Sequence, residues 1–323
     1  MLHTRRMPLY LTEDMVDSLI GPAEAVAAVE GSFRRLAAGE VENRPRYRVP
    51  VEGGLLHVMS AVDRGLGLTG SKTYVGGRNG SAFVISLFDA VEHRLVAVLE
   101  ADRLGQLRTG AASAVAAKYL AKAGARTLGI IGTGWQAQTQ VQCIREAVPT
   151  IERVLAYGRN EERLDSFCKL VGAHGAEGHR EAAEQDIVVT MTTSKDPVVR
   201  GDWLQPGALV CAAGANRLVA REIDNVVLQR AAFVCCDSIE QARLESGDLV
   251  EPVEAGVLDW LEVHELAEVI GGEVVGRQSD DDIVVFKSNG LAAWDVALAA
   301  VAVERARERG VGIEVPGAST RRR

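Results

Sequence analysis

Residues 128–138 read LGIIGTGWQAQ, and this short stretch constrains the fold more than any other feature of the chain. Gly132, Gly134 and Ala137 form a G-x-G-x-x-A pattern between an apolar run and a segment with helical spacing. In such a turn the first glycine permits a tight bend, the second lets the backbone approach a pyrophosphate, and the third position needs only a small residue. The phosphates would bind at the positive end of the helix. A plain strand-to-helix turn is the alternative, and the flanking segments favour dinucleotide binding.

The segments around the turn predict a Rossmann domain. Apolar residues at positions 137, 141, 144 and 148 recur with the spacing of one helix face. Short apolar runs that read as strands occupy residues 126–131, 153–157, 186–192, 208–214 and 231–237. Strands that alternate with helices are typical of a parallel sheet.

The first 120 residues have a different pattern, in which residues 81–89 and 94–102 flank a polar turn and predict an antiparallel hairpin. Residues 290–309 predict one long helix that returns to this part. We therefore expect an α/β protein: a Rossmann dinucleotide-binding domain, residues 121–289, inserted in an α+β substrate and dimerisation domain, residues 1–120 and 290–323. The run FVISLF would expose apolar area on an isolated small domain, so we expect a homodimer.

Composition argues against several function classes. A formal net charge of −8 disfavours nucleic acid as the main partner. The six histidines do not cluster and the five cysteines include no C-x-x-C pair, so we expect no metal site and reduced thiols. No stretch has the length and apolarity of a signal peptide or a membrane helix, and we expect a cytoplasmic protein without a membrane partner.

The end of the second Rossmann strand indicates which nicotinamide cofactor is preferred. NAD-binding proteins usually place an acidic residue there to hold the ribose 2′-hydroxyl. In LAYGRNEERL, Gly158 occupies this position and Arg159 and Asn160 follow. A guanidinium there suits a 2′-phosphate, which predicts NADP(H) over NAD(H). The alternative is that Arg159 is a solvated loop residue and that Glu161 or Glu162 supplies the acid.

Three cations of the first part are candidates for an anion site: Arg46 in NRPRYRVP, Lys72 in LTGSKTYVGG and Arg108 in GQLRTGAAS. Arg108 directly precedes Thr109 and a helix of small residues, so we expect its guanidinium and a helix N-terminus to converge on one spot. For each cation taken singly, the alternative is an ordinary surface position.

The segments RTGAASAVAAKYLA, LGIIGTGWQAQTQ, AREID, ARLESGDL and VVFKSNGLAAWDVALA together resemble the ornithine cyclodeaminase and mu-crystallin family over almost the whole chain. The resemblance implies a two-domain dimer with a Rossmann domain between the parts of a substrate domain. It also implies chemistry on small α-amino or α-imino acids with a nicotinamide cofactor.

Site roles follow from this resemblance. Arg46 and Arg108 would hold the substrate carboxylate, and Lys72 would polarise the imine or carbonyl group and pass a proton, its pKa lowered by the cations beside it. Asp224 in REID would face the amino or imino nitrogen, with helix capping as the alternative. We also expect cofactor contacts from Thr109, Thr133, Gln136, Thr192 and Ser288.

Position 57 departs from the pattern of the ornithine-converting members, in which a glutamate beside the methionine motif would hold the side-chain ammonium. His57 stands there in this chain, and an imidazole holds an ammonium poorly. We therefore expect His57 in the substrate site and net reduction of a small imino acid such as Δ1-pyrroline-2-carboxylate. The alternatives are an ornithine cyclodeaminase or alanine dehydrogenase with bound NAD, and a crystallin-like binding protein.

Overall fold

The computed structural model describes residues 7–77 and 80–316, which divide into two compact units. The first unit consists of residues up to 108 together with those from 291 onward, and the second is residues 109–290. Helix α3 (Asp102–Leu120) crosses the boundary at 108/109 without a break, whereas the sequence places the boundary after residue 120.

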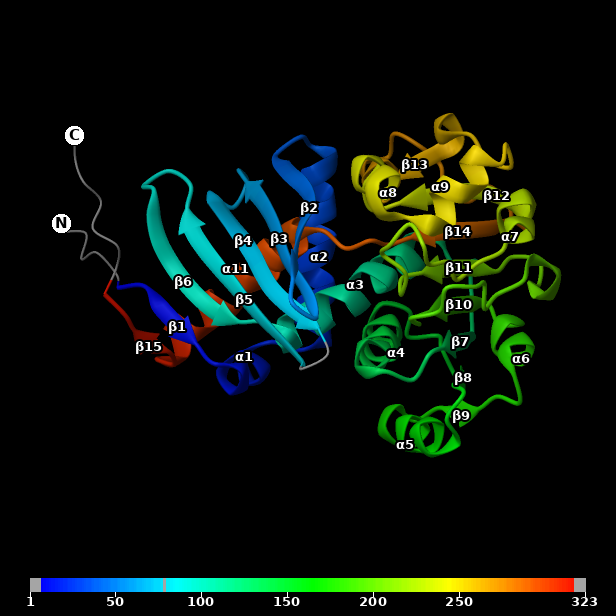
Figure 1. The fold of residues 1–323 in the computed structure, drawn as a ribbon, viewed down its shortest axis with the longest axis horizontal. Coiled ribbons are helices and arrows are strands. Elements are labelled where there is room, and N and C mark those ends of the chain that lie inside the picture. The colour runs from blue at the N-terminus through cyan, green and yellow to red at the C-terminus, as the bar shows by residue number, and fades with distance from the viewer. Residues whose placement is uncertain (1–6, 78–79, 317–323) are drawn as a thin grey trace. The chain divides into compact units, whose positions relative to one another are not determined.

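The second unit contains an eight-stranded sheet in the order β13-β12-β14-β11-β10-β7-β8-β9, and all its pairs are parallel (Figure 1). Every residue of β10, β11 and β14 is buried, as expected for strands covered on both faces. The strands are β7 (Thr127–Ile131), β8 (Arg153–Tyr157), β9 (His174–Gly175), β10 (Ile187–Thr190), β11 (Leu209–Ala212), β12 (Ala231–Cys236), β13 (Val263–Glu265) and β14 (Ile283–Lys287). The five strands predicted from the sequence in this region are therefore confirmed.

Helices lie on both faces of this sheet (Figure 1). The helix that follows the glycine turn, α4 (Trp135–Ala147), buries Ala137, Val141 and Ile144, which confirms the predicted helix face. Gly129 in β7 permits close packing, because a Cβ there would lie 1.7 Å from the carbonyl oxygen of Ala182. The other helices of this unit are α5 (Glu161–Val171), α6 (His179–Ala183), α7 (Asn225–Arg230), α8 (Ile239–Glu245), α9 (Gly247–Glu254) and α10 (Leu266–Gly271).

The first unit contains a seven-stranded sheet in the order β15-β1-β6-β5-β4-β3-β2. Its pairs are antiparallel except β1 with β6, and the β5–β6 pair confirms the predicted hairpin. Strands β2, β3 and β4, which the sequence analysis did not predict, extend this hairpin into a meander. The strands are β1 (Leu9–Leu11), β2 (Val41–Val51), β3 (Gly54–Asp63), β4 (Leu68–Gly77), β5 (Gly80–Asp89), β6 (Arg94–Glu100) and β15 (Ile313–Glu314).

Helix α11 (Ala292–Arg309) packs on one face of this sheet together with α2 (Pro22–Ala37), while α1 (Glu13–Leu19) lies near β6. Trp294 of α11 contacts Phe33 of α2 with ring centroids 5.3 Å apart, and both are fully buried. Gly70 of β4 allows the close approach, because a Cβ there would lie 3.1 Å from a methyl group of Val296. The predicted long C-terminal helix is thus part of the first unit.

The opposite face of the seven-stranded sheet carries exposed apolar side chains. The strand register aligns Tyr47, Val58, Thr73 and Val84 in one row across β2, β3, β4 and β5. Val84 is 39% exposed and Tyr47 is 68% exposed, whereas Ile85, on the α11 face of the same strand, is fully buried. This unit therefore has one covered and one uncovered apolar face.

Among the described residues, no helix combines the length and apolarity that crossing a membrane requires.

Candidate functional site

The glycine turn after β7 has the geometry that its sequence predicts. Gly132 has φ +113°, and a Cβ at this position would lie 2.1 Å from the carbonyl oxygen of Met191. Gly158, at the end of β8, leaves room for Thr133, because a Cβ would lie 2.6 Å from the Thr133 Oγ1. Only glycine fits at Gly132, since both the backbone conformation and the space exclude a side chain.

The space above Gly134 is open, and a dinucleotide phosphate fits there. A Cβ on Gly134 would meet no protein atom within 4 Å. Gly134 is the N-cap of α4, no side chain caps this helix, and its first turn contains no acidic residue. The buried Gln136 Oε1 has no hydrogen-bond partner in the described structure. The positive end of a helix without a side-chain cap, beside open space, suits an anion.

The residues expected to select the cofactor lie at the end of β8. Asn160 caps α5, its side chain accepting from the Arg163 N–H at 2.8 Å. The Tyr157 and His179 rings lie 4.4 Å apart. Burial, and then the charge of Arg159, lower the pKa of His179. Asn160 is therefore engaged by the helix, while Arg159 lies close enough to His179 to influence it electrostatically.

Three other residues expected at the cofactor lie in the same unit. The carbonyl of Thr109, in α3, accepts a hydrogen bond from the Gln140 side chain of α4 at 3.3 Å. The Thr192 N–H and hydroxyl both donate to Glu222, which the sequence analysis did not single out. The Ser288 hydroxyl donates to the buried Asp237 carboxylate at 3.1 Å.

Asp224 caps helix α7, which is the alternative weighed from the sequence. Its Oδ1 accepts hydrogen bonds from the Gly201 and Val227 N–H groups, both at 3.0 Å. A carboxylate oxygen that accepts two backbone amides stabilises the start of a helix. The structure therefore shows Asp224 as a helix cap, and its expected role at the amino or imino nitrogen stays a prediction.

In the first unit, Lys72 and Arg108 converge on one carboxylate, Asp295. The Lys72 Nζ and the Arg108 Nε each lie 3.1 Å from the Asp295 Oδ1, and the three side chains come from β4, α3 and α11. Lys72 is 3% exposed and Asp295 is 1% exposed. The buried Arg46 lies nearby, with its Nε 3.4 Å from the Met59 sulfur. The structure thus brings the three predicted cations into one unit and buries all of them.

The surroundings of Lys72 lower its pKa to about 8. Burial is the largest cause, Arg108 and Arg46 also lower the value, and Asp295 raises it. The expected direction is confirmed, although desolvation contributes more than the neighbouring cations. Lys72 can therefore exchange a proton near neutral pH, because its ammonium and amine forms are both accessible there.

Aromatic rings form the next row across this sheet. The His57 and Tyr74 rings stack at 4.2 Å with an interplanar angle of 3°, and Phe83 follows Tyr74 at 4.9 Å. The Lys72 Nζ lies 5.4 Å from the Phe83 ring centroid. His57 is thus part of a flat apolar surface next to the buried cations.

One expectation about Arg108 is wrong. Helix α3 begins at Asp102, so Arg108 lies within the helix and the N-terminus of α3 is not beside it. The Arg108 Nε instead contacts Asp295 in the first turn of α11. The first turn is held by Glu13, whose carboxylate accepts from the Asp102 and Arg103 N–H groups. The anion-binding character of Arg108 therefore comes from its own guanidinium.

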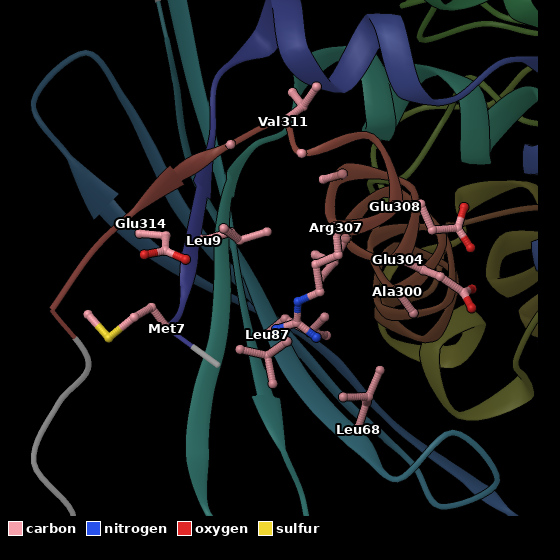
Figure 2. A pocket seen from close by; sticks show the side chains of 15 residues that line it. Met7, Leu9, Leu68, Leu87, Ala300, Glu304, Arg307, Glu308, Val311 and Glu314 are labelled. Carbon is pink, nitrogen blue, oxygen red and sulfur yellow. The ribbon is translucent and has the colours of Figure 1, made fainter. Parts of the chain in front are cut away.

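A cavity of about 940 Å³ in the first unit lies along the C-terminal half of α11, away from the cations. Figure 2 shows the Arg307 side chain reaching towards Leu87 and Leu68, while Glu304 and Glu308 point in another direction. None of Arg46, Lys72, Arg108 and Asp295 lines it. Within residues 7–77 and 80–316, no cluster of histidine, cysteine and carboxylate side chains could hold a metal ion.

The open space at Gly134 yields a first prediction. Gly134→Ala keeps the melting temperature, because the backbone has φ −83° and the added methyl group meets no protein atom. The methyl group fills space that a phosphate needs, so calorimetry will show affinity for NADPH or NADH lower by about tenfold or more. Gly129→Ala is the control that lowers the melting temperature. Unchanged cofactor affinity in Gly134→Ala would disprove the phosphate site.

The Asp295 carboxylate yields a second prediction. Asp295→Asn removes the group that raises the pKa of Lys72 and keeps the two that lower it through charge, so Lys72 will lose its proton at a pH below 8. The chemical shift of the Lys72 Cε, followed by NMR against pH, measures this change. The variant will also lose about 3–5 kcal/mol of stability in urea unfolding, because two buried cations lose their partner. Titration of Lys72 at its ordinary value of 10.5 in the unmodified protein would contradict this electrostatic account.

Comparison with known proteins identifies relatives of the same length. The chain is 35% identical over 317 residues to an alanine dehydrogenase of Archaeoglobus fulgidus, covering 95% of this chain and 98% of that one. The structure of Thermococcus litoralis Δ1-pyrroline-2-carboxylate reductase in complex with NADH and L-proline superposes with a TM-score of 0.89 at 32% identity, over 95% of this chain and 100% of that chain. An archaeal alanine dehydrogenase dimer with bound NAD superposes with a TM-score of 0.90 at 33% identity, over 96% of this chain and 99% of that chain.

The chain also matches a protein family over most of its length. Residues 7–310 match the sequence profile of the Ornithine cyclodeaminase/mu-crystallin family, and the chain belongs to this family.

Proposed function

We propose that this protein is an NAD(P)H-dependent oxidoreductase that reduces a small α-imino acid, such as the cyclic ketimine Δ1-pyrroline-2-carboxylate, to the amino acid. The observation that carries the proposal is the buried group of Lys72, Arg108 and Asp295, with Arg46 beside it. Buried guanidinium and ammonium groups in one place can bind a substrate carboxylate through charge-assisted hydrogen bonds. The Δ1-pyrroline-2-carboxylate reductase and alanine dehydrogenase relatives support this choice of substrate class.

Arg46 and Arg108 bind the substrate carboxylate in this proposal. A guanidinium offers paired N–H donors in a fixed plane, which orients a carboxylate as well as attracting it. Asp295 accepts from the Nε of Arg108 and so restricts the orientation of that guanidinium. Holding the acid in one orientation fixes which carbon can react.

Lys72 supplies the proton. A bound reduced nicotinamide would supply the hydride for the imine carbon, and the C=N π electrons would become the nitrogen lone pair. The nitrogen gains one proton to give the amine, and the Lys72 ammonium, whose pKa is about 8, can donate it. In the reverse direction, the neutral amine of Lys72 would accept that proton while an amino acid is oxidised.

The rings of His57, Tyr74 and Phe83 favour a substrate with an apolar side chain. Flat rings offer dispersion contacts to a ring such as that of a cyclic ketimine. None of these three side chains is a carboxylate that could pair with a side-chain ammonium of the substrate. A protonated His57 would repel such an ammonium. The alternative reaction on ornithine is therefore disfavoured.

Turnover by the purified protein tests the proposal. With NADPH or NADH and Δ1-pyrroline-2-carboxylate, loss of absorbance of the reduced cofactor will accompany proline formation. Arg108→Ala will lower kcat/KM by about a hundredfold, because a charge-assisted hydrogen bond contributes about 1.5–3 kcal/mol. Arg159→Ala is the control in the other unit, and it will keep the KM for the imino acid.

Each competing function predicts a different outcome of this assay. If ornithine with NAD+ is the one substrate that is turned over, the protein is a cyclodeaminase. If alanine with NAD+ is the one substrate that is turned over, it is an alanine dehydrogenase. Cofactor binding without turnover of any of these substrates would identify a binding protein. Full activity of folded Arg108→Ala would exclude the proposed carboxylate clamp.

The proposed cofactor preference is NADP(H) over NAD(H). Gly158 removes the acidic residue that would repel a 2′-phosphate, and Arg159 offers a cation next to that position. The related structures contain NADH or NAD, so the preference rests on this chain's own residues. In the same assay, KM will be lower for NADPH than for NADH, and Arg159→Ala will narrow that difference. Equal KM values in the unmodified protein would contradict this preference.

We also propose that two copies pair through the uncovered face of the seven-stranded sheet. Val84 and Tyr47 belong to the exposed row on that face, and a solved alanine dehydrogenase relative is a dimer. Covering such a face removes apolar area from water.

Light scattering measures this assembly. The unmodified protein will have twice the 34.6 kDa mass of one chain. Val84→Lys will lower the measured mass towards that of one chain, because pairing would bury the lysine charge in the contact. Val91→Lys is the matched control, because Val91 is 76% exposed in the turn between β5 and β6. A mass of one chain for the unmodified protein would exclude the dimer.

A further inference from the structure

Three neighbouring strands of the second unit, β10, β11 and β14, end beside one buried carboxylate, Glu222. Its Oε1 accepts the Thr192 N–H at 2.7 Å and the Thr192 hydroxyl at 2.8 Å. Its Oε2 accepts the Gly214 N–H at 2.7 Å and the Ala215 N–H at 2.9 Å. One side chain therefore joins the loop after β10 to the loop after β11.

A second buried pair holds Glu222 in place. The Asp248 Oδ1 accepts the N–H groups of Glu222 and Ile223 at 2.7 and 3.1 Å. The Lys287 Nζ, at the end of β14, donates to the Asp248 Oδ2 at 2.9 Å and to the Ala215 carbonyl at 2.6 Å. Glu222, Asp248 and Lys287 are all fully buried. Lys287 thus fixes the β11 loop directly and, through Asp248, the backbone of Glu222.

The hydrogen bonds require Glu222 to accept at both oxygens. Three of these four partners are backbone N–H groups, which can only donate, and the Thr192 hydroxyl donates as well. The pKa of Glu222 is raised, chiefly by burial and also by the charge of Asp248, while the charge of Lys287 and the bonds to Thr192 oppose this shift. An ionised carboxylate accepts from all four donors. A protonated carboxyl group or an amide would place its own hydrogen-bond donor opposite at least one of these donors.

The strand order indicates which half of a bound dinucleotide these loops would contact. In a doubly wound sheet the ligand lies at the carboxyl ends of the strands, where the strand order reverses, and each half of the sheet binds one nucleotide. Here the reversal lies at β7, with β8 and Arg159 on one side and β10, β11 and β14 on the other. The adenosine half belongs to the β8 side, and the nicotinamide half belongs to the Glu222 side.

We propose that Glu222 is a positioning residue for the nicotinamide half of the cofactor, acting through the loops at Thr192 and at Gly214 and Ala215. This inference rests on the proposed dinucleotide binding and assigns the two halves of the cofactor to different residues. The glycine turn and Arg159 determine affinity for the adenosine half, while Glu222 holds the two loops that contact the nicotinamide half. A Cβ at Gly214 would lie 2.3 Å from the Thr192 nitrogen, so the two loops are already in close contact.

Calorimetry with the whole cofactor and with one half of it tests this proposal. The probes are NADPH and 2′,5′-ADP, which lacks the nicotinamide half. Glu222→Gln keeps the shape of the side chain but turns an NH₂ group towards backbone donors. Its affinity for NADPH will fall by about tenfold or more, since an unsatisfied buried donor costs about 1–3 kcal/mol, while its affinity for 2′,5′-ADP will stay unchanged.

Asp186→Asn is the matched control at the other end of the sheet. The Asp186 Oδ2 accepts the Arg126 and Thr127 N–H groups and the Thr127 hydroxyl, much as Glu222 holds Thr192. It lies before β10, at the amino end of that strand. The control will lose stability in thermal unfolding and bind both probes as the unmodified protein does, which separates positioning from a general loss of stability.

The outcomes distinguish this inference from the function on which it rests. If the unmodified protein binds neither these probes nor NADH, the proposed function fails. If it binds NADH alone, only the proposed cofactor preference fails, and NADH and ADP replace the two probes. If it binds both and folded Glu222→Gln loses affinity for both equally or for neither, the positioning role is wrong. If Glu222→Gln does not fold, Thr192→Val, which removes only the hydroxyl donor, replaces it. This variant will lose a smaller part of the affinity for the whole cofactor and keep its affinity for the adenosine half. Unchanged affinity for the whole cofactor would overturn the inference.

Discussion

The ion pairs of Asp295 with Lys72 and Arg108 are the interaction on which the chemistry of the first unit depends. A single carboxylate oxygen lies 3.1 Å from both cations, and all three groups are buried. Burial favours the neutral form of Lys72, and the adjacent Asp295 carboxylate counteracts this effect. Asp295 therefore holds two cations inside the fold, and in the proposed function these cations attract an anionic ligand.

The second unit uses buried charge differently. Around Glu222, Asp248 and Lys287 the hydrogen bonds link backbone groups of several loops, so the charge serves to fix loops. The proposed phosphate site of this unit would need no buried cation, because the glycine turn lies at the positive N-terminus of α4. A net charge of −8 is compatible with anion binding in both units, since each site is local.

Local patterns predicted the second unit well, and long-range contacts explain what they missed. The glycine turn, the strand at residues 153–157 and the buried face of α4 depend on neighbouring residues, and all three are confirmed. Asp295 is 223 residues away from Lys72, and in the sequence it only interrupts an apolar helix. A carboxylate within such a helix is a signal of burial with a partner, but nothing local names that partner. For Asp224, only the hydrogen bonds of the fold show that its Oδ1 caps a helix, because the sequence alone allows both a capping and a chemical role.

The charges around Lys72 also link ligand binding to folding. Lys72 and Arg108 contact one buried carboxylate, Asp295, and repulsion from Arg108 and Arg46 is part of what lowers the pKa of Lys72. A carboxylate ligand placed among them would favour the ammonium form of Lys72, since a nearby negative charge raises the pKa of a cation. Binding an acid would then supply both the orientation of the substrate and the proton that its reduction consumes. Any ligand that relieves this repulsion binds the folded state alone, so it must also stabilise that state against unfolding. The repulsion that lowers the pKa of Lys72 would therefore also favour the binding of a small anion in the proposed function.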